Sequence, residues 1–178
     1  MGRCGSWYAF QRMDVLPDVL TSAKALAGGL PIGATVAGDE FAFGPGEHAS
    51  TFGGGPLVCK GALAVLDVIE REGLVENARE QGGRLLAGLN GALRSNGSAG
   101  AARGLGLLVG APVGAGRARG IVEGLMARGF LATEAGPDVV RATPPLTVDA
   151  QSVDAFVAAF GESLGSTGEP PESKEAAG

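Results

Sequence analysis

Residues 17–37 read PDVLTSAKALAGGLPIGATVA, and the order of residue types in this stretch predicts the local fold. The short apolar run from Asp18 to Thr21 is typical of a buried strand. Lys24 follows this run closely, and a double glycine, a proline and a further glycine then mark a loop that leads into a second apolar run. We therefore expect a lysine near the end of a strand, beside backbone that glycine leaves uncovered.

A lysine in this position suits covalent chemistry. A nucleophilic lysine must be neutral for part of its cycle, and burial beside cofactor groups lowers the pKa of an ammonium in that direction. The glycines at 28, 29 and 33 would let a flat ligand approach the backbone closely. The alternative is an ordinary solvated lysine in a loop, because a lysine near two glycines is by itself a weak motif.

Outside this stretch the pattern predicts a mixture of helices and short strands. Residues 43–56 are mostly turn formers, and from Pro56 to Leu93 apolar residues recur every three or four positions, which predicts one long helix that breaks near Gly73. Beyond it we expect a linker at 95–104, a strand at 105–113, a helix at 118–129, strands at 130–133 and 138–143, and a helix at 149–165 that Asp149 caps. The second half is therefore predicted to be α+β.

Three motifs resemble a known family in the family's own order. Residues 17–37 resemble the cofactor-lysine segment of the class-III pyridoxal-phosphate aminotransferases, HASTFGGGP at 48–56 resembles that family's H-x-S/T-T loop, and VRATPPLTV at 140–148 resembles its R-x-x-P-P strand. The likeness extends over about residues 1–164. The helical residues 62–85 and GLGLLVG at 104–110 look most like the acetylornithine branch.

The resemblance implies an α/β fold, the fold type I of pyridoxal-phosphate-dependent transferases. It divides the chain into part of a large cofactor-binding domain at 1–55, a long connecting helix at 56–95 and a complete small C-terminal α+β domain at 96–164. The remaining residues, 165–178, are rich in Gly, Pro, Ser and Glu without periodicity, so we expect a disordered tail.

The resemblance also implies roles for four residues. Lys24 would form the Schiff base with pyridoxal 5'-phosphate and carry the catalytic proton, and Thr51 would donate to the cofactor phosphate of a neighbouring subunit. Ser50 would lie at the substrate site, although both hydroxyls also suit a plain turn. Arg141 leaves an apolar strand before two prolines and would hold a substrate carboxylate, its alternative being an edge arginine paired with an acid.

The implied activity is transfer of the terminal amino group of N-acetylornithine to 2-oxoglutarate, a step of arginine biosynthesis, by a cytoplasmic homodimer. An ornithine or 4-aminobutyrate aminotransferase shares the lysine segment and stays open as an alternative. The substrates would be a small-molecule amino donor and a 2-oxo acid.

The first residues, MGRCGSWYAFQ, match a mid-chain segment of the family, so we expect the family's first half to be missing. The aspartate that pairs with the pyridine nitrogen, the phosphate-binding turn, the stacking aromatic and another arginine would be missing with it. Cys4 and Gly55 also replace the usual Thr and Asn. A noncatalytic remnant that only docks onto a homologue is therefore a second reading, beside an enzyme.

Composition excludes several other classes. The chain has 178 residues, 45% of them hydrophobic, and 14 Lys and Arg against 19 Asp and Glu leave a net charge of −5, so nucleic acid is not an expected partner. Two cysteines and one histidine are too few for a zinc site, and no run approaches the roughly 20 apolar residues that span a bilayer. We therefore expect no metal and no membrane association, and no chemical role for Cys4, Cys59, His48 or Trp7.

Overall fold

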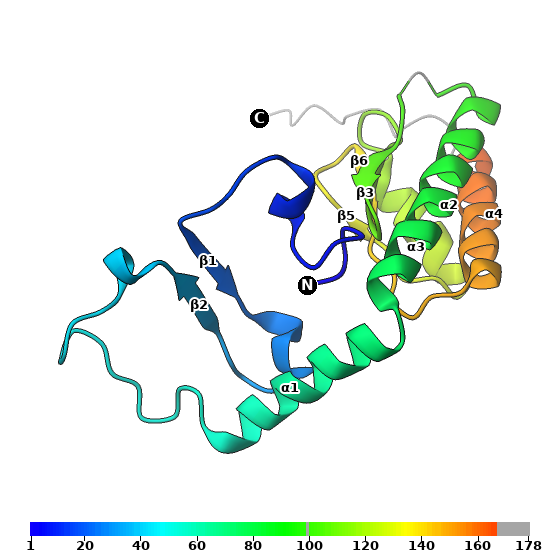
Figure 1. The fold of residues 1–178 in the computed structure, drawn as a ribbon. Helices are drawn as coiled ribbons and strands as arrows, with labels where there is room; N and C mark the ends of the chain where they lie inside the picture. Colours follow the sequence, from blue (N-terminus) through cyan, green and yellow to red (C-terminus); the bar gives the residue numbers. More distant parts are fainter. Residues whose placement is uncertain (99, 167–178) are drawn as a thin grey trace, which may run out of the picture. The chain divides into compact units, whose positions relative to one another are not determined.

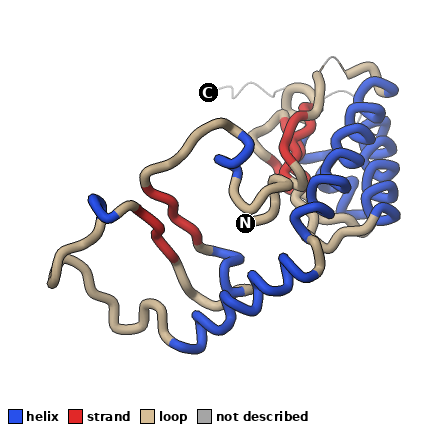
Figure 2. Tube along the Cα trace, viewed as in Figure 1, coloured by secondary structure: helices blue, strands red, loops and turns tan. Residues whose placement is uncertain are grey.

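The structure is a computed structural model that describes residues 1–98 and 100–166. The chain divides into two compact units, of which the first runs from Met1 to Glu76 and the second begins at Asn77. Figures 1 and 2 show the elements of both units. No helix in the described part of the chain is long and apolar enough to cross a membrane.

The first unit contains an antiparallel pair of short strands. Strand β1 (Val19–Ser22) lies beside β2 (Ala34–Ala37), with Val19 opposite Ala37 and Ser22 opposite Ala34. The strand predicted after Asp18 is confirmed, but its predicted burial is wrong, since its residues alternate between exposed and half-buried. Among the described residues β1 and β2 pair only with each other, so no further strand extends this two-stranded sheet.

The predicted long helix is broken where a glycine interrupts it. Helix α1 (Pro56–Arg71) begins with a proline, which has no backbone N–H to lose in the first turn. Helix α2 (Leu74–Ser95) begins just after Gly73, whose φ of +62° ends the first helix in the left-handed region. The predicted break is therefore confirmed.

A small core joins α1 to the segment around the lysine. Leu26 and Ala27, from a one-turn 3-10 helix at Lys24–Ala27, are buried together with Ala62 of α1. A Cβ added at Gly61 would lie 2.8 Å from Leu30 Cδ1, so glycine at this position allows α1 to approach the loop closely. Packing against α1 thus holds the residues that follow Lys24.

The second unit contains a four-stranded antiparallel sheet in the order β3-β4-β6-β5. Its strands are β3 (Arg103–Leu105), β4 (Leu108–Pro112), β5 (Thr133–Glu134) and β6 (Val139–Ala142). The prediction of one strand at 105–113 is wrong, because Leu105 pairs with Leu108 across a two-residue turn in which Gly106 has a φ of +53°. The predicted linker at 95–104 likewise contributes its last two residues to β3.

Helices α2, α3 (Ala118–Ala127) and α4 (Ala150–Ser166) supply the helical half of this unit's core, together with one face of the sheet. The largest side chains buried there come from the three helices, from β4 and β6, and from the residues that flank β4: Phe160, Leu85, Leu89, Leu93, Leu107, Ile121, Leu125, Val109, Val113, Val140 and Val153. The alternate residues of the strands lie on the opposite, outer face, where they are exposed or half-buried. The second unit is therefore a two-layer α+β structure.

The predicted cap of the last helix is confirmed. The Asp149 carboxylate Oδ1 accepts a hydrogen bond of 2.7 Å from the Ser152 backbone N–H, at the N-terminus of α4. Gly165 and Ser166 are the last residues of α4. The rest of the tail predicted to be disordered, from residue 167 onward, lies outside the described residues.

Candidate functional site

Lys24 lies two residues beyond the end of β1, in an unusual backbone conformation. Its φ is +55°, a left-handed value that residues with a Cβ seldom adopt and that is often found at functional positions. The side chain is exposed, and among the described residues its ammonium makes no hydrogen bond or ion pair. The local fold therefore presents an amine that no other group engages.

The backbone after Lys24 is open on one side. Gly28 ends the 3-10 helix with a φ of +64°, and Gly29 follows with a φ of +107° and no atom within 4 Å of the position a Cβ would occupy. The predicted approach of a ligand to bare backbone is thus sterically possible at Gly29. Because Lys24 is exposed, however, the first unit alone does not supply the burial that was expected around it.

A groove of about 550 Å³ lies between the loop that precedes β2 and the start of α1. Pro31–Gly33 line one part of it, and Ser50 and Phe52–Val58 line the rest. Both parts belong to the first unit, so the structure brings Ser50 close to the loop that follows Lys24. Neither Lys24 nor Thr51 is among the residues that line this groove.

In the loop that contains Ser50 and Thr51, the two side-chain hydroxyls differ in their hydrogen bonding. Ser50 Oγ accepts a hydrogen bond of 3.0 Å from the Gly53 backbone N–H, so the plain turn considered from the sequence forms at Ser50. A Cβ added at Gly53 would lie 2.7 Å from that oxygen, which accounts for the glycine. Thr51 is exposed and its hydroxyl has no partner within the described ranges, so it remains able to bind an anion.

Arg141 belongs to the second unit, on strand β6 between β4 and β5. Its side chain is exposed, and its Nε donates a hydrogen bond of 3.0 Å to Thr133 Oγ1 on β5. The alternative, an edge arginine paired with an acid, is wrong for the described residues. Strand β6 is an inner strand, and no carboxylate there forms an ion pair with the Arg141 guanidinium. The contact of Arg141 with Thr133 was not predicted from the sequence, because only the pairing of β5 with β6 places these two residues opposite each other.

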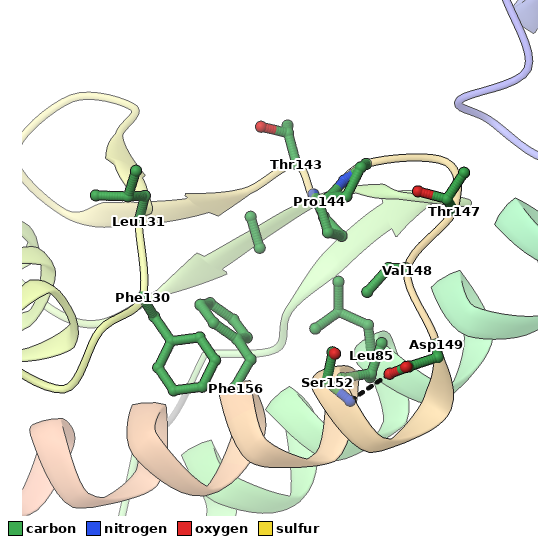
Figure 3. A pocket seen from close by; sticks show the side chains of 13 residues that line it. Leu85, Phe130, Leu131, Thr143, Pro144, Thr147, Val148, Asp149, Ser152 and Phe156 are labelled. Carbon is green, nitrogen blue, oxygen red and sulfur yellow. Dashed lines mark hydrogen bonds between the residues drawn. The ribbon is translucent and has the colours of Figure 1, made fainter.

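The second unit also contains a pocket of about 390 Å³. Phe130 and Phe156 form its apolar floor, with ring centroids 5.7 Å apart in an edge-to-face arrangement, and Asp149 and Ser152 lie at its other end (Figure 3). Arg141 is not among its lining residues, although the loop that lines one wall begins just after it. The pocket is mainly apolar, and none of the four residues with an expected role, Lys24, Ser50, Thr51 and Arg141, lines it.

The remaining chemically reactive side chains form no site. Cys4 and Cys59 are free thiols, the Cys59 Sγ donates to the Gly54 carbonyl at 3.2 Å, and His48 stacks on Phe43. In the described part of the chain no three His, Cys, Asp or Glu side chains gather as metal ligands would.

Comparison with known proteins identifies the family. The model of the aminotransferase class-III family matches residues 1–164. The chain is 49% identical over 160 residues to acetylornithine aminotransferase of Gloeobacter violaceus, covering 89% of this chain and 40% of that protein. It is 43% identical to acetylornithine aminotransferase of Thermosynechococcus vestitus, covering 92% and 41%.

Solved structures agree with the sequence comparison. Acetylornithine aminotransferase from Elizabethkingia anophelis superposes with a TM-score of 0.83 at 30% identity, covering 92% of this chain and 44% of that one. Ornithine aminotransferase from Plasmodium yoelii gives a TM-score of 0.83 at 31% identity, with 92% and 45% covered. The partial fold of a pyridoxal-phosphate-dependent aminotransferase is therefore confirmed.

The family expected from three short motifs is also the family found over nearly the whole described chain, and the agreement extends through both units. This chain belongs to the class-III aminotransferases.

Proposed function

We propose that the chain provides the cofactor-lysine part of an aminotransferase that transfers the terminal amino group of N-acetylornithine to 2-oxoglutarate. The chain spans about 40% of the length of the curated relatives it matches, so the whole reaction is a proposal for this protein. The observation that carries it is Lys24, a free amine in a left-handed conformation inside a family match that covers residues 1–164.

The described residues fit pyridoxal 5'-phosphate in the parts of the site that they supply. The cofactor needs a lysine amine, which Lys24 presents unengaged, and donors for its phosphate, for which the free Thr51 hydroxyl is suited. Gly29, where a Cβ would meet no atom, leaves space for a flat ring beside the backbone. When bound, pyridoxal phosphate supplies an electron sink for the substrate carbon.

Four residues of this chain would then have separate roles in binding and catalysis. Lys24 Nζ would hold the cofactor covalently and, once the amino donor displaces it, move a proton at the carbon that bears the amino group. Thr51 Oγ1 would donate to the phosphate of a neighbouring copy, Ser50 would lie beside the donor, and the guanidinium of Arg141 would bind a substrate carboxylate. A homodimer and a cytoplasmic location belong to the same proposal and rest on the resemblance and the sequence.

Identity favours N-acetylornithine as the donor. The curated relatives at 49% and 43% identity both carry the name acetylornithine aminotransferase, whereas the solved acetylornithine and ornithine aminotransferases, at 30% and 31% identity, are equally similar to this chain. Ornithine is therefore the second candidate donor, and it differs from the first in carrying a free α-amino group.

A chimera tests the proposed reaction. The part of the Gloeobacter violaceus relative that the match leaves uncovered is joined to this chain, and amino transfer to 2-oxoglutarate is measured with N-acetylornithine, ornithine and 4-aminobutyrate. We expect the highest kcat/KM with N-acetylornithine, and a loss of about 10²-fold or more in Lys24→Ala but not in Lys60→Ala. Higher kcat/KM with ornithine would select the alternative donor, and a folded but inactive chimera would favour the noncatalytic remnant.

A further inference from the structure

The outer face of the second unit's sheet carries a row of four residues, one from each strand. Arg103 of β3 lies opposite Gly110 of β4, Gly110 lies opposite Arg141 of β6, and Arg141 lies opposite Thr133 of β5. Directly paired residues share a face of the sheet, so these four form one line across it. The three that have side chains are all exposed.

Within this row the Arg141 side chain is supported on one side only. Thr133 Oγ1 accepts a hydrogen bond of 3.0 Å from Arg141 Nε, whereas Gly110, on the other side, has no side chain that could contact it. Among the described residues the terminal nitrogens Nη1 and Nη2 make no hydrogen bond and no ion pair. The guanidinium is thus tethered at Nε and open at its end.

This arrangement restricts how a carboxylate can bind. A guanidinium offers a carboxylate two paired sets of N–H groups, one along its Nε–Nη edge and one across Nη1 and Nη2. Because Thr133 accepts the Nε–H, the first set is incomplete and the second is free. A carboxylate would therefore bind end-on.

We propose that Thr133 is a positioning residue that holds the Arg141 guanidinium for end-on binding of a substrate carboxylate. The inference rests on the proposed function, which assigns carboxylate binding to Arg141. A long arginine side chain loses rotamer freedom when it binds, and a side chain held in place beforehand loses less. Removing the Thr133 hydroxyl should therefore weaken carboxylate binding about three- to tenfold.

The experiment uses the full 178-residue chain and 2-oxoglutarate as the probe. The side-chain ¹⁵Nε–¹Hε signal of Arg141, assigned by its loss in Arg141→Lys, is followed by NMR during titration. Thr133→Val removes the acceptor while keeping the branched shape, Thr133→Ser keeps the hydroxyl, and Thr147→Val makes the same change at an exposed threonine elsewhere in the unit.

We expect 2-oxoglutarate to shift the Arg141 signal, with a Kd that rises about three- to tenfold in Thr133→Val and returns to the wild-type value in Thr133→Ser and Thr147→Val. Exchange of the Arg141 Hε with solvent should also accelerate in Thr133→Val alone, a local effect that a loss of stability shared with Thr147→Val would not produce. If Thr133→Val loses the native amide spectrum, Thr133→Ala carries the same comparison.

The two possible failures are distinguishable. Equal affinity in wild type and Thr133→Val overturns the positioning role and leaves Arg141 as a carboxylate ligand. A wild-type chain in which 2-oxoglutarate leaves the Arg141 signal unmoved overturns the assignment of carboxylate binding to Arg141, and the inference with it.

Discussion

Lys24, the residue on which the proposed reaction depends, has a left-handed backbone conformation. A left-handed conformation in a residue with a Cβ costs on the order of 1 to 3 kcal/mol and persists only where the surroundings impose it. Here the buried Leu26 and Ala27 fix the turn that follows the lysine. The core of the first unit therefore maintains the conformation in which the amine is presented.

Asp149 should make stability depend on pH. The backbone N–H of Ser152 donates to its carboxylate and holds the pKa of Asp149 below its usual range. Because the folded chain favours the charged form, this contribution is present above about pH 4 and is lost as the pH falls through the lowered pKa. Asp149→Asn keeps an acceptor for the cap but does not titrate, so its Tm should fall less than that of the wild type between pH 7 and pH 3.

Arg84 donates to Asp154 and likewise lowers the pKa of that carboxyl, so part of the acid sensitivity should remain in Asp149→Asn. Asp154→Asn serves as the matched control for that remaining part. An equal fall in Tm for wild type and Asp149→Asn would show that the cap contributes nothing to the pH dependence.

Site residues differed in how far the sequence could predict their environment. Asp149 could be predicted as a cap because a cap depends on neighbours within three positions. The turn at Ser50 was open as an alternative for the same reason. The partner of Arg141 could not be predicted, because Thr133 reaches it through the register of two strands, which local patterns do not determine.

Among the elements, helix α2 and the turn between β3 and β4 approach each other closely at two glycines, Gly82 and Gly106. A Cβ added at Gly82 of α2 would collide with the backbone of Gly106 in that turn, whereas a Cβ added at the neighbouring Gly83 would meet no atom within 4 Å. The close approach of helix to turn therefore requires a glycine at 82 but not at 83.

Gly82→Ala and Gly83→Ala should change stability in opposite directions. The first forces the helix and the turn apart and should lower the free energy of unfolding by about 1 to 3 kcal/mol. The second replaces a helical glycine by a better helix former and should raise it by roughly 0.5 to 1 kcal/mol. Urea unfolding followed by circular dichroism measures both, and a loss of similar size in the two variants would contradict the close contact between α2 and the turn.

Helices could be predicted from the sequence better than strands. The spacing of apolar residues and Gly73 located α1, α2 and the break between them, since both signals are local. The β3–β4 hairpin was predicted as one strand because its two-residue turn interrupts a continuous apolar run without a polar residue. The first strand was predicted in place but too buried, since burial depends on what covers the sheet.

At the scale of the whole molecule, the proposed activity draws on both units. Lys24, Ser50 and Thr51 belong to the first and Arg141 to the second, while the family match runs through both. Three motifs sufficed to predict the family because each combines unusual residue types at fixed spacing. Large apolar side chains in the first unit, such as Leu16 at 89% and Phe52 at 88%, are exposed. The motifs could not predict this exposure, because it depends on which distant parts of the chain cover these side chains.

The attachment site of pyridoxal 5'-phosphate shows directly whether Lys24 is the cofactor lysine. The chimera is incubated with one equivalent of the cofactor and reduced with borohydride, and the modified lysine is located by peptide mapping, with Lys24→Arg as the control. This chain offers three lysines, Lys24, Lys60 and Lys174. We expect the label to lie on Lys24 and to disappear in Lys24→Arg, whereas a label on Lys60, or one spread evenly over the three, would contradict the role proposed for Lys24.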